Sequence, residues 1–337
     1  MPFDRFMEIS LYDPSDGYFA AGAVRSEKEG DFLTSPEVSP LFGETLARFV
    51  AAERERIGEP FSVVEVAAGT GSLLRPLLDA LAEPVAAVAV EVSASAQLRL
   101  GEAVPEAVVV DTFDAVPDPL RGVVIANELL DNLPAAVAVR RGGRWMERAV
   151  IAEDEGLGYA EVEARSVVAA WADLHAGSVP DDAVVEVQLA AGAWLRGVLN
   201  RLAGGAVVVI DYGDTTDGLA PRRAEGTIRT YRGHHLGPDP LLEPGATDIT
   251  MDVDFSALMR VAVEAGAAVR LHRQVEFLSE WGIREALVEL RVAELDAARR
   301  GDAMHRVVLR SQVVDAEALL HPRGLGDFRV LEARVGS

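Results

Sequence analysis

Residues 63–73 read V-V-E-V-A-A-G-T-G-S-L, and this stretch decides the fold class of the chain. Valines surround Glu65, and the run then bends through Gly69 and Gly71. A strand that turns through glycines into a helix presents backbone N–H groups at the helix N-terminus, with no Cβ atoms in the way of a ligand. The stretch therefore predicts the first strand–turn–helix unit of a Rossmann-like α/β domain.

Further apolar runs follow along the chain at 86–92, 107–111 and 122–126, and helical patterns separate them. Runs of valine and alanine without polar alternation are typical of strands that are buried on both faces of a parallel sheet. The intervening helices provide the right-handed crossovers that such a sheet needs. These residues are therefore predicted to form one half of a doubly wound domain.

The pattern changes after Pro134, where alternating residues on both sides of Gly142-Gly143 predict a hairpin. The buried-strand pattern returns at 206–213, and residues 214–250 then lack periodicity, which is typical of a long functional loop. The predicted organisation has an N-terminal helical cap or arm at 1–45, the first half of the main domain at 46–135, an inserted subdomain at 136–205, and the second half at 206–337 with the loop 214–250.

The composition narrows the class of protein. Of the 337 residues, 49% are hydrophobic and 26% are charged, which is typical of a soluble globular protein. The formal net charge of −22 disfavours nucleic acid as a partner and favours a cationic one. The absence of cysteine excludes disulfides, thiolate metal sites and a cysteine nucleophile. Because no signal-peptide pattern or membrane-length apolar run occurs, we expect a cytoplasmic protein without a membrane span.

Glu91, at the end of the second predicted strand, indicates an adenosine-bearing cofactor. It stands where a carboxylate can accept hydrogen bonds from both ribose hydroxyls. The glycine turn and this acid do not by themselves separate NAD from S-adenosylmethionine. Two details near the turn favour S-adenosylmethionine: the third glycine of the dinucleotide motif is absent after Gly71, and Glu65 can orient the loop or a methionine ammonium group.

Polar residues also end the third and fourth predicted strands, as Asp111-Thr112 and Asn127-Glu128. The carboxyl ends of parallel strands meet at one edge of the sheet, which is where open α/β sheets bind ligands. This third detail again favours S-adenosylmethionine, although each acid could instead be a solvent-facing strand end.

Five longer motifs carry a resemblance that is more specific than the glycine turn. Residues 30–44, 64–73, 126–134, 210–214 and 239–255 closely resemble the MidA family in order and spacing, over nearly the whole chain. The resemblance implies a class I S-adenosylmethionine-dependent methyltransferase with a seven-stranded sheet whose last strand is antiparallel, plus an inserted domain. It also implies an arginine-like nitrogen as acceptor, because mitochondrial members methylate arginine in a subunit of respiratory complex I and assist its assembly.

The family usually has glycine near position 67, where this chain has Ala67 and Ala68. A methyl group there is expected to crowd the carboxypropyl end of the cofactor and to reduce its affinity. The loop 30–38 is expected, by resemblance, to fold over the cofactor; the residues alone predict a helix N-cap at Ser35. The predicted cofactor-binding residues are Thr34, Pro36, Glu65, Ala67, Gly69, Thr70, Gly71, Glu91, Val92, Asp111, Thr112 and Asn127.

A guanidinium acceptor needs carboxylates that hold it and accept its proton. Glu128 and Asp131, three residues apart after the fourth strand, are the predicted catalytic pair. An alternative is that Asp131 only caps the following turn and Glu128 alone contacts the ligand. Further candidates on the acceptor side are Asp31, Glu37, Asp211 and His235. We predict no metal site, because His235 and its neighbour His234 have no third ligand at a metal-like spacing.

The sequence leaves the acceptor open. Arginine in a protein partner is the preferred prediction. The alternatives are free arginine or another small molecule, a non-catalytic assembly factor that binds the cofactor, and an NAD-dependent oxidoreductase, which the absent third glycine weakens. A homodimer is also left open.

Overall fold

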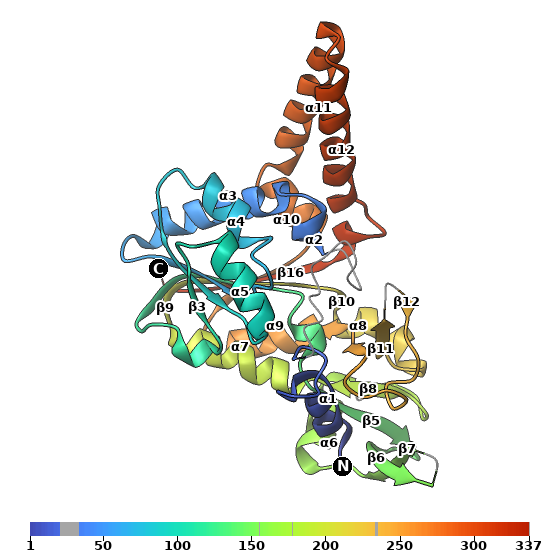
Figure 1. Ribbon diagram of the computed structural model, residues 1–337. Coiled ribbons are helices and arrows are strands. Elements are labelled where there is room, and N and C mark those ends of the chain that lie inside the picture. Colours follow the sequence, from blue (N-terminus) through green and yellow to red (C-terminus); the bar gives the residue numbers. More distant parts are fainter. Residues whose placement is uncertain (21–33, 155, 177, 233–234, 337) are drawn as a thin grey trace.

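The computed structural model describes residues 1–20, 34–154, 156–176, 178–232 and 235–336, and these include a mixed seven-stranded sheet (Figure 1). Its spatial order is β15 (Ala268–Arg273), β16 (Arg329–Val335), β9 (Leu202–Asp211), β4 (Leu120–Asn127), β1 (Ser62–Val66), β2 (Ala86–Val90) and β3 (Val108–Val110). Strand β16 runs antiparallel to both of its neighbours, and the pairs from β9 to β3 are parallel. The predicted class I arrangement is therefore confirmed.

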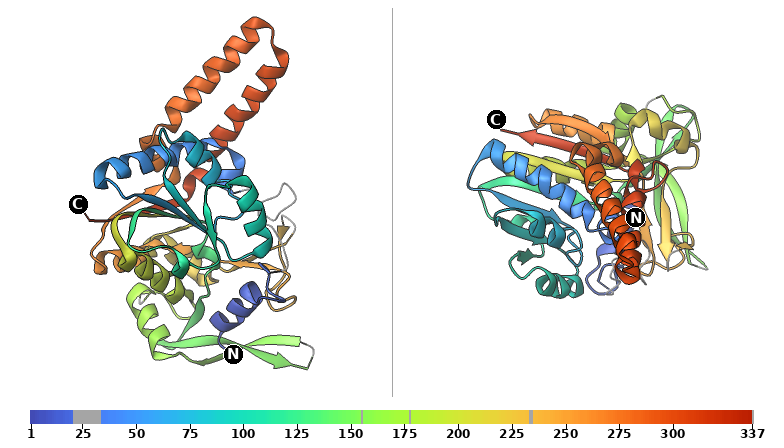
Figure 2. Two further views of the ribbon diagram at one scale, coloured as in Figure 1. Left: turned by 60° about the vertical axis from the view of Figure 1, so that its left-hand side comes forward. Right: turned by 90° about the horizontal axis from the view of Figure 1, so that it is seen from above.

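Helices cover both faces of this sheet, because its central strands are apolar on both faces. Helices α3 (Leu41–Ile57), α4 (Leu74–Ala80), α5 (Ala94–Ala103) and α10 (Gln274–Glu280) lie on one face, where Val63 and Ile125 point. Helices α7 (Leu189–Arg201) and α9 (Phe255–Glu264) cover the other, where Val64 and Val124 point. Figure 2 shows the sheet between these two layers.

A second, antiparallel sheet forms the insertion, in the order β7 (Gly156–Glu163), β6 (Arg144–Glu153), β5 (Ala136–Arg141) and β8 (Val184–Val187). Helix α6 (Ser166–Ala176) packs on one of its faces, and helix α1 (Phe3–Tyr12) packs on β5 and β6. Helix α7 lies inside the range 136–205 that the sequence assigns to the insertion. Its side chains nevertheless pack in the core of the seven-stranded sheet, as the crossover from β4 towards β9.

The segment 214–250, predicted as a loop without periodicity, contains short elements. These are β10 (Gly213–Asp214), α8 (Thr216–Leu219), a 3₁₀ turn (Ala220–Ala224), β11 (Arg229–Arg232), β12 (His235–Leu236) and β13 (Asp248–Thr250), followed by β14 (Val253–Asp254). Strand β11 pairs with β12 and β13, and β10 pairs with β14. Elements of two to five residues are too short to show a hydrophobic period, so the sequence pattern did not reveal them.

Between α10 and β16 the chain forms a helical hairpin, α11 (Ile283–Arg300) and α12 (Ala303–Leu319), which projects from the body (Figures 1 and 2). Gly301, at φ 73°, ends α11 in the left-handed conformation that suits glycine. The base of the hairpin packs through Leu287 and Val313 against Leu41. The four-residue helix α2 (Ser35–Val38) contacts α12 near this base. None of the described helices is long and apolar enough to cross a membrane.

Candidate active site

A cavity of about 350 Å³ lies at the carboxyl ends of β1 to β4. The structure brings most of the predicted cofactor residues together in its wall: Thr34, Pro36, Glu65, Ala67, Gly69, Glu91, Val92, Asp111, Thr112 and Asn127. Thr70 and Gly71 do not line it. Gly71 instead permits close packing, because a Cβ atom there would lie 2.8 Å from Cγ2 of Val104.

The cavity wall also contains side chains that the sequence did not single out for cofactor binding. They are Tyr12, Phe19, Ser93, Ala96, Phe113, Leu129, Asn132, Leu133 and Trp194. Tyr12 comes from α1, and its hydroxyl donates a hydrogen bond to the backbone oxygen of Asn132 at 3.2 Å. Trp194 comes from α7 and packs against the core of the sheet. Leu129, Asn132 and Leu133 lie in the 126–134 motif, whereas Tyr12, Phe19 and Trp194 lie outside the five motifs, because distant segments deliver them to the cavity.

Glu65 is a buried acid in the cavity wall. Its Oε2 atom has no hydrogen-bond partner among the described residues. Burial, reinforced by the nearby charge of Glu91, raises the pKa of Glu65 well above its ordinary value. A cationic group in the cavity would compensate the negative charge of this carboxylate. Glu65 therefore suits the ammonium group of a methionine moiety.

Glu91 holds the glycine loop against β2. Its two carboxylate oxygens accept hydrogen bonds from the backbone N–H groups of Gly69 and Ser93, each at 2.8 Å. Each oxygen has a second lone pair, which can accept a ribose hydroxyl. Next to Gly69, at φ 55°, the position of a Cβ atom is open space, so a ligand can approach the backbone closely. The loop therefore has room for an adenosine-bearing molecule.

Ala67 adopts φ 59°, in the left-handed region, and its side chain lines the cavity. An L-residue with a Cβ atom is strained there by roughly 1–2 kcal/mol relative to right-handed backbone. This strain explains in physical terms why glycine suits the position. The predicted effect of its methyl group on cofactor affinity stays a prediction.

Glu128 follows β4 directly and also has a left-handed backbone, at φ 51°. Its N–H donates to the backbone oxygen of Ile210 at 2.8 Å, and its Oε1 accepts from Nδ2 of Asn127 at 3.3 Å. Oδ1 of Asn127 is buried without a partner among the described residues. Strained backbone in a cavity wall is typical of functional positions, because the surrounding structure must hold it.

A second cavity, of about 490 Å³, shares Thr34 and Glu128 with the first. Its other wall residues are Asp131, Tyr212, Gly213, Arg222, Arg229, Tyr231, Asp248, Thr250, Asp252, Arg323, Gly324, Asp327 and Phe328. Glu128 thus faces both cavities, and the predicted partner Asp131 lines only the second. The two cavities together form one site with Glu128 at the junction.

Asp131 is buried, and its Oδ2 accepts a hydrogen bond from the hydroxyl of Tyr212 at 2.6 Å. Burial, together with the charges of Asp131 and Asp211, raises the pKa of Tyr212 well above its ordinary value. Tyr212 therefore donates this bond at any neutral pH. Asp131 lies inside the 3₁₀ turn Leu130–Asn132, whose N-cap residue is Leu129, and the alternative in which Asp131 only caps a following turn stays a prediction.

Asp211 is fully buried and lines neither cavity. Its carboxylate accepts hydrogen bonds from the backbone N–H groups of Leu130 at 2.9 Å, Asp131 at 3.3 Å and Tyr212 at 2.9 Å. Burial, with the charges of Asp131 and Glu128, raises its pKa well above the ordinary value. The structure thus gives Asp211 a place behind the turn that carries Asp131, rather than the predicted contact with the acceptor.

The remaining acceptor-side candidates lie elsewhere. Glu37 forms a capping box with Thr34, accepting from the Thr34 backbone N–H at 2.8 Å, and the N-cap is Thr34 rather than the predicted Ser35. His235, in the short strand β12, is exposed and lines neither cavity. Asp31 and His234 lie outside the described residues. Within the described part of the chain, no group of three His, Cys, Asp or Glu side chains is placed to hold a metal ion.

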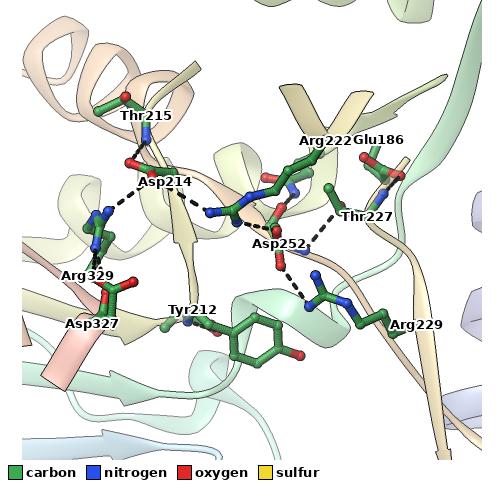
Figure 3. A network of polar contacts seen from close by, with 12 residues as sticks. Glu186, Tyr212, Asp214, Thr215, Arg222, Thr227, Arg229, Asp252, Asp327 and Arg329 are labelled. Carbon is green, nitrogen blue, oxygen red and sulfur yellow. Dashed lines mark hydrogen bonds and ion pairs between the residues drawn. The ribbon is translucent and has the colours of Figure 1, made fainter. Parts of the chain in front are cut away.

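A polar network fixes the segment 214–252 beside the second cavity (Figure 3). Asp252 accepts from Arg222 at 2.5 Å and from Arg229 at 3.1 Å, and Asp214 pairs with Arg329 at 3.0 Å. The sequence did not single out these arginines, because ion-pair partners so far apart along the chain leave no local pattern.

Comparison with known proteins agrees with this geometry. A protein-family model described as an S-adenosyl-L-methionine-dependent methyltransferase matches residues 45–273. The chain belongs to this family. The resemblance of this methyltransferase to MidA proteins is therefore confirmed, and its cofactor is S-adenosylmethionine, as the sequence predicted.

A solved structure of a protein from Burkholderia thailandensis, bound to S-adenosyl-homocysteine, is 33% identical to this methyltransferase. The TM-score is 0.87, and the match covers 99% of this chain and 88% of that chain. The mouse protein named "Protein arginine methyltransferase NDUFAF7, mitochondrial" is 28% identical, over 96% of this chain and 78% of its own length. The human protein of the same name is 27% identical, over 96% and 77%.

Proposed function

We propose that this methyltransferase methylates a guanidinium nitrogen of arginine in a protein acceptor. The observation that carries the proposal is the position of Glu128, which lines both the cofactor cavity and the neighbouring cavity. A carboxylate at this junction suits a cationic acceptor that must meet the cofactor. The names of the mouse and human relatives, which specify a protein arginine methyltransferase, support the same acceptor.

S-adenosylmethionine supplies a methyl group on a sulfonium sulfur for in-line displacement by a nucleophile. A guanidinium is a poor nucleophile because its lone pairs are delocalised and it stays protonated. The carboxylate of Glu128 accepts hydrogen bonds from the guanidinium and draws positive charge towards the nitrogens it contacts. It also accepts the proton that the attacked nitrogen releases when the new N–C bond forms.

Asp131 contributes a second carboxylate, which Tyr212 orients. The Tyr212 hydroxyl donates to Oδ2 of Asp131 at 2.6 Å, and Asp211 holds the backbone of the same turn from behind. The orientation of Asp131 is thereby fixed before an acceptor binds, so binding causes a smaller loss of side-chain entropy. The acceptor guanidinium would then lie between Glu128 and Asp131.

Glu128→Gln tests the proposal. Purified protein is incubated with methyl-labelled S-adenosylmethionine and either cell lysate or free arginine, and the products are hydrolysed for amino-acid analysis. We expect labelled methylarginine in lysate protein, and at least a hundredfold slower labelling by the variant, because a neutral amide neither balances the guanidinium charge nor accepts its proton.

The control is Glu55→Gln, on the exposed face of α3, which lines neither cavity. Calorimetry with S-adenosylhomocysteine shows whether each variant still binds the cofactor product. Label in another amino acid, or in free arginine alone, would replace the protein-arginine assignment. Turnover by the Glu128→Gln variant at the normal rate would remove Glu128 from the reaction.

A further inference from the structure

The described wall of the second cavity includes three arginines, Arg222, Arg229 and Arg323, in a chain whose formal net charge is −22. The proposed acceptor group is itself a guanidinium, which these cations would repel. The arginines therefore do not bind the target guanidinium. A negatively charged part of the acceptor would in contrast be attracted to them.

Arg222 and Arg229 share one carboxylate. Both pair with Asp252, which is 3% exposed, at N–O distances of 2.5 and 3.1 Å. The other acid near Arg222 is Asp214, at 3.8 Å, and Asp214 lies closer to Arg329, at 3.0 Å. Figure 3 shows Arg222 and Arg229 approaching Asp252 from different sides. Arg222 and Arg229 therefore share Asp252, and Arg222 shares Asp214 with Arg329, so neither cavity arginine has a carboxylate to itself.

Arg323 adds a third cation from a different segment. It follows α12 and precedes the 3₁₀ turn Leu325–Asp327, and its backbone N–H donates to Nδ1 of His321 at 3.3 Å. Its side chain makes no ion pair or hydrogen bond with any residue that the structure describes, although it is exposed and lines the cavity. A guanidinium in this state is available to a ligand.

We propose that Arg323, Arg222 and Arg229, which line the same cavity, form an anion subsite that binds a carboxylate adjacent to the target arginine. Arginine matches a carboxylate with two parallel N–H···O bonds, so the subsite selects acceptors in which aspartate or glutamate flanks the methylated residue. The inference rests on the proposed function. It also opposes the expectation from net charge, which on its own favours acceptors with basic flanks.

Three N-acetylated, C-amidated peptides test the inference: Gly-Gly-Arg-Gly-Gly, Gly-Glu-Arg-Glu-Gly and Gly-Lys-Arg-Lys-Gly. The measurement is kcat/KM for label transfer. We expect kcat/KM for the glutamate peptide to be about fivefold higher than for the glycine peptide, a factor between the effects of an exposed ion pair and of a charged hydrogen bond. The lysine peptide should have the lowest kcat/KM. Nα-acetylarginine and its amide, run in parallel, distinguish an α-carboxylate from a side-chain carboxylate as the anion.

Substitutions assign the effect to the subsite. Arg323→Ala should remove most of the preference for glutamate over glycine, and Arg323→Glu should reverse it in favour of lysine. The matched control is Arg144→Ala, which removes the same charge from an exposed position in the β5–β6 hairpin, outside both cavities. It should leave the order of the three peptides unchanged.

The failures of the inference and of the proposed function are distinguishable. Equal rates for the three peptides, a preference for lysine, or the same effect from Arg144→Ala would overturn the anion subsite and leave arginine methylation in place. Label in lysate methylarginine but in none of the peptides would also overturn it, because adjacent carboxylates would then not suffice. Absence of methylarginine from lysate and peptides alike would overturn the proposed function itself.

Discussion

Individual residues in this site combine strain with burial. Ala67 and Glu128 have left-handed backbones, and Glu65 is a buried acid whose Oε2 lacks a partner among the described residues. The sequence identified all three as site candidates: Ala67 from the glycine that the family usually has near this position, Glu128 from its place after the fourth strand, and Glu65 from its place in the first strand before the turn. Only the tertiary structure shows that Ala67 and Glu128 are strained, because the backbone angle φ depends on how the following turn packs.

Replacing Ala67 by Gly should stabilise the protein. The substitution removes left-handed strain from the folded state, but glycine also raises the conformational entropy of the unfolded chain, which partly offsets the gain. We expect a net rise in the free energy of unfolding of up to about 1 kcal/mol. Ala68→Gly is the matched control: Ala68 is buried and has no positive φ, so the same change should lower stability by about 1 kcal/mol. Urea denaturation measures both. A loss of stability in both variants would contradict the strain argument.

Replacing Glu65 by Gln should stabilise the cofactor-free protein at high pH only. Below the ordinary glutamate pKa of 4.5, Glu65 is protonated in the folded and unfolded chains alike. As the pH rises above that value, the unfolded chain loses its proton first, because burial raises the folded pKa. The wild type therefore loses stability over this window, and the glutamine variant does not.

Denaturation of both proteins at about pH 4 and about pH 8 measures this difference, which should appear at the higher pH and vanish at the lower. Calorimetry should meanwhile show weaker binding of S-adenosylhomocysteine by Glu65→Gln, because the neutral amide no longer balances an ammonium group. A wild type that is more stable than the variant at the higher pH would show that Glu65 is already compensated in the absence of cofactor.

At the scale of elements, the hydrophobic pattern predicted the buried strands but did not show which sheet helix α7 packs against. The predicted runs 86–92 and 122–126 contain all of β2 and the middle of β4, because strands buried on both faces require unbroken apolar runs. The pattern of α7 is equally helical whether it packs on the insertion or on the main sheet. Its location at the main sheet depends on Leu195 and Val198 meeting the side chains of the sheet.

The α11–α12 hairpin illustrates an element whose outer half contributes little to the fold. Its base packs through Leu287, Leu290 and Val313, whereas residues 298–308 are exposed. We expect a variant with residues 291–312 replaced by a short glycine linker to stay folded, with a thermal midpoint within about 3 °C of the wild type, because little buried area is lost. Differential scanning calorimetry and S-adenosylhomocysteine binding check this. Unfolding of the truncated protein would show that the hairpin is part of the main cooperative unit.

At the scale of the whole molecule, the site forms where distant segments meet. Thr34 comes from the N-terminal region, Glu128 from the end of β4, Tyr212 from the end of β9, and Arg323 from the segment after α12. The net charge of −22 describes the average surface, yet the acceptor cavity contains an acidic junction and a group of arginines. In the proposed function, recognition of the acceptor therefore depends on local charge more than on the average.

Local pattern in the chain predicted a doubly wound α/β sheet, favoured S-adenosylmethionine and supplied most residues of the cofactor cavity, and the resemblance to the MidA family added the class I strand arrangement. Strand ends in a parallel sheet share one edge, so a motif after each strand already implies its neighbours in space. The buried place of Asp211, the contact of Tyr212 with Asp131, and the arginines around Asp252 emerged only from tertiary packing. Such contacts join residues that are far apart along the chain, and no periodicity or local motif records which of them will meet.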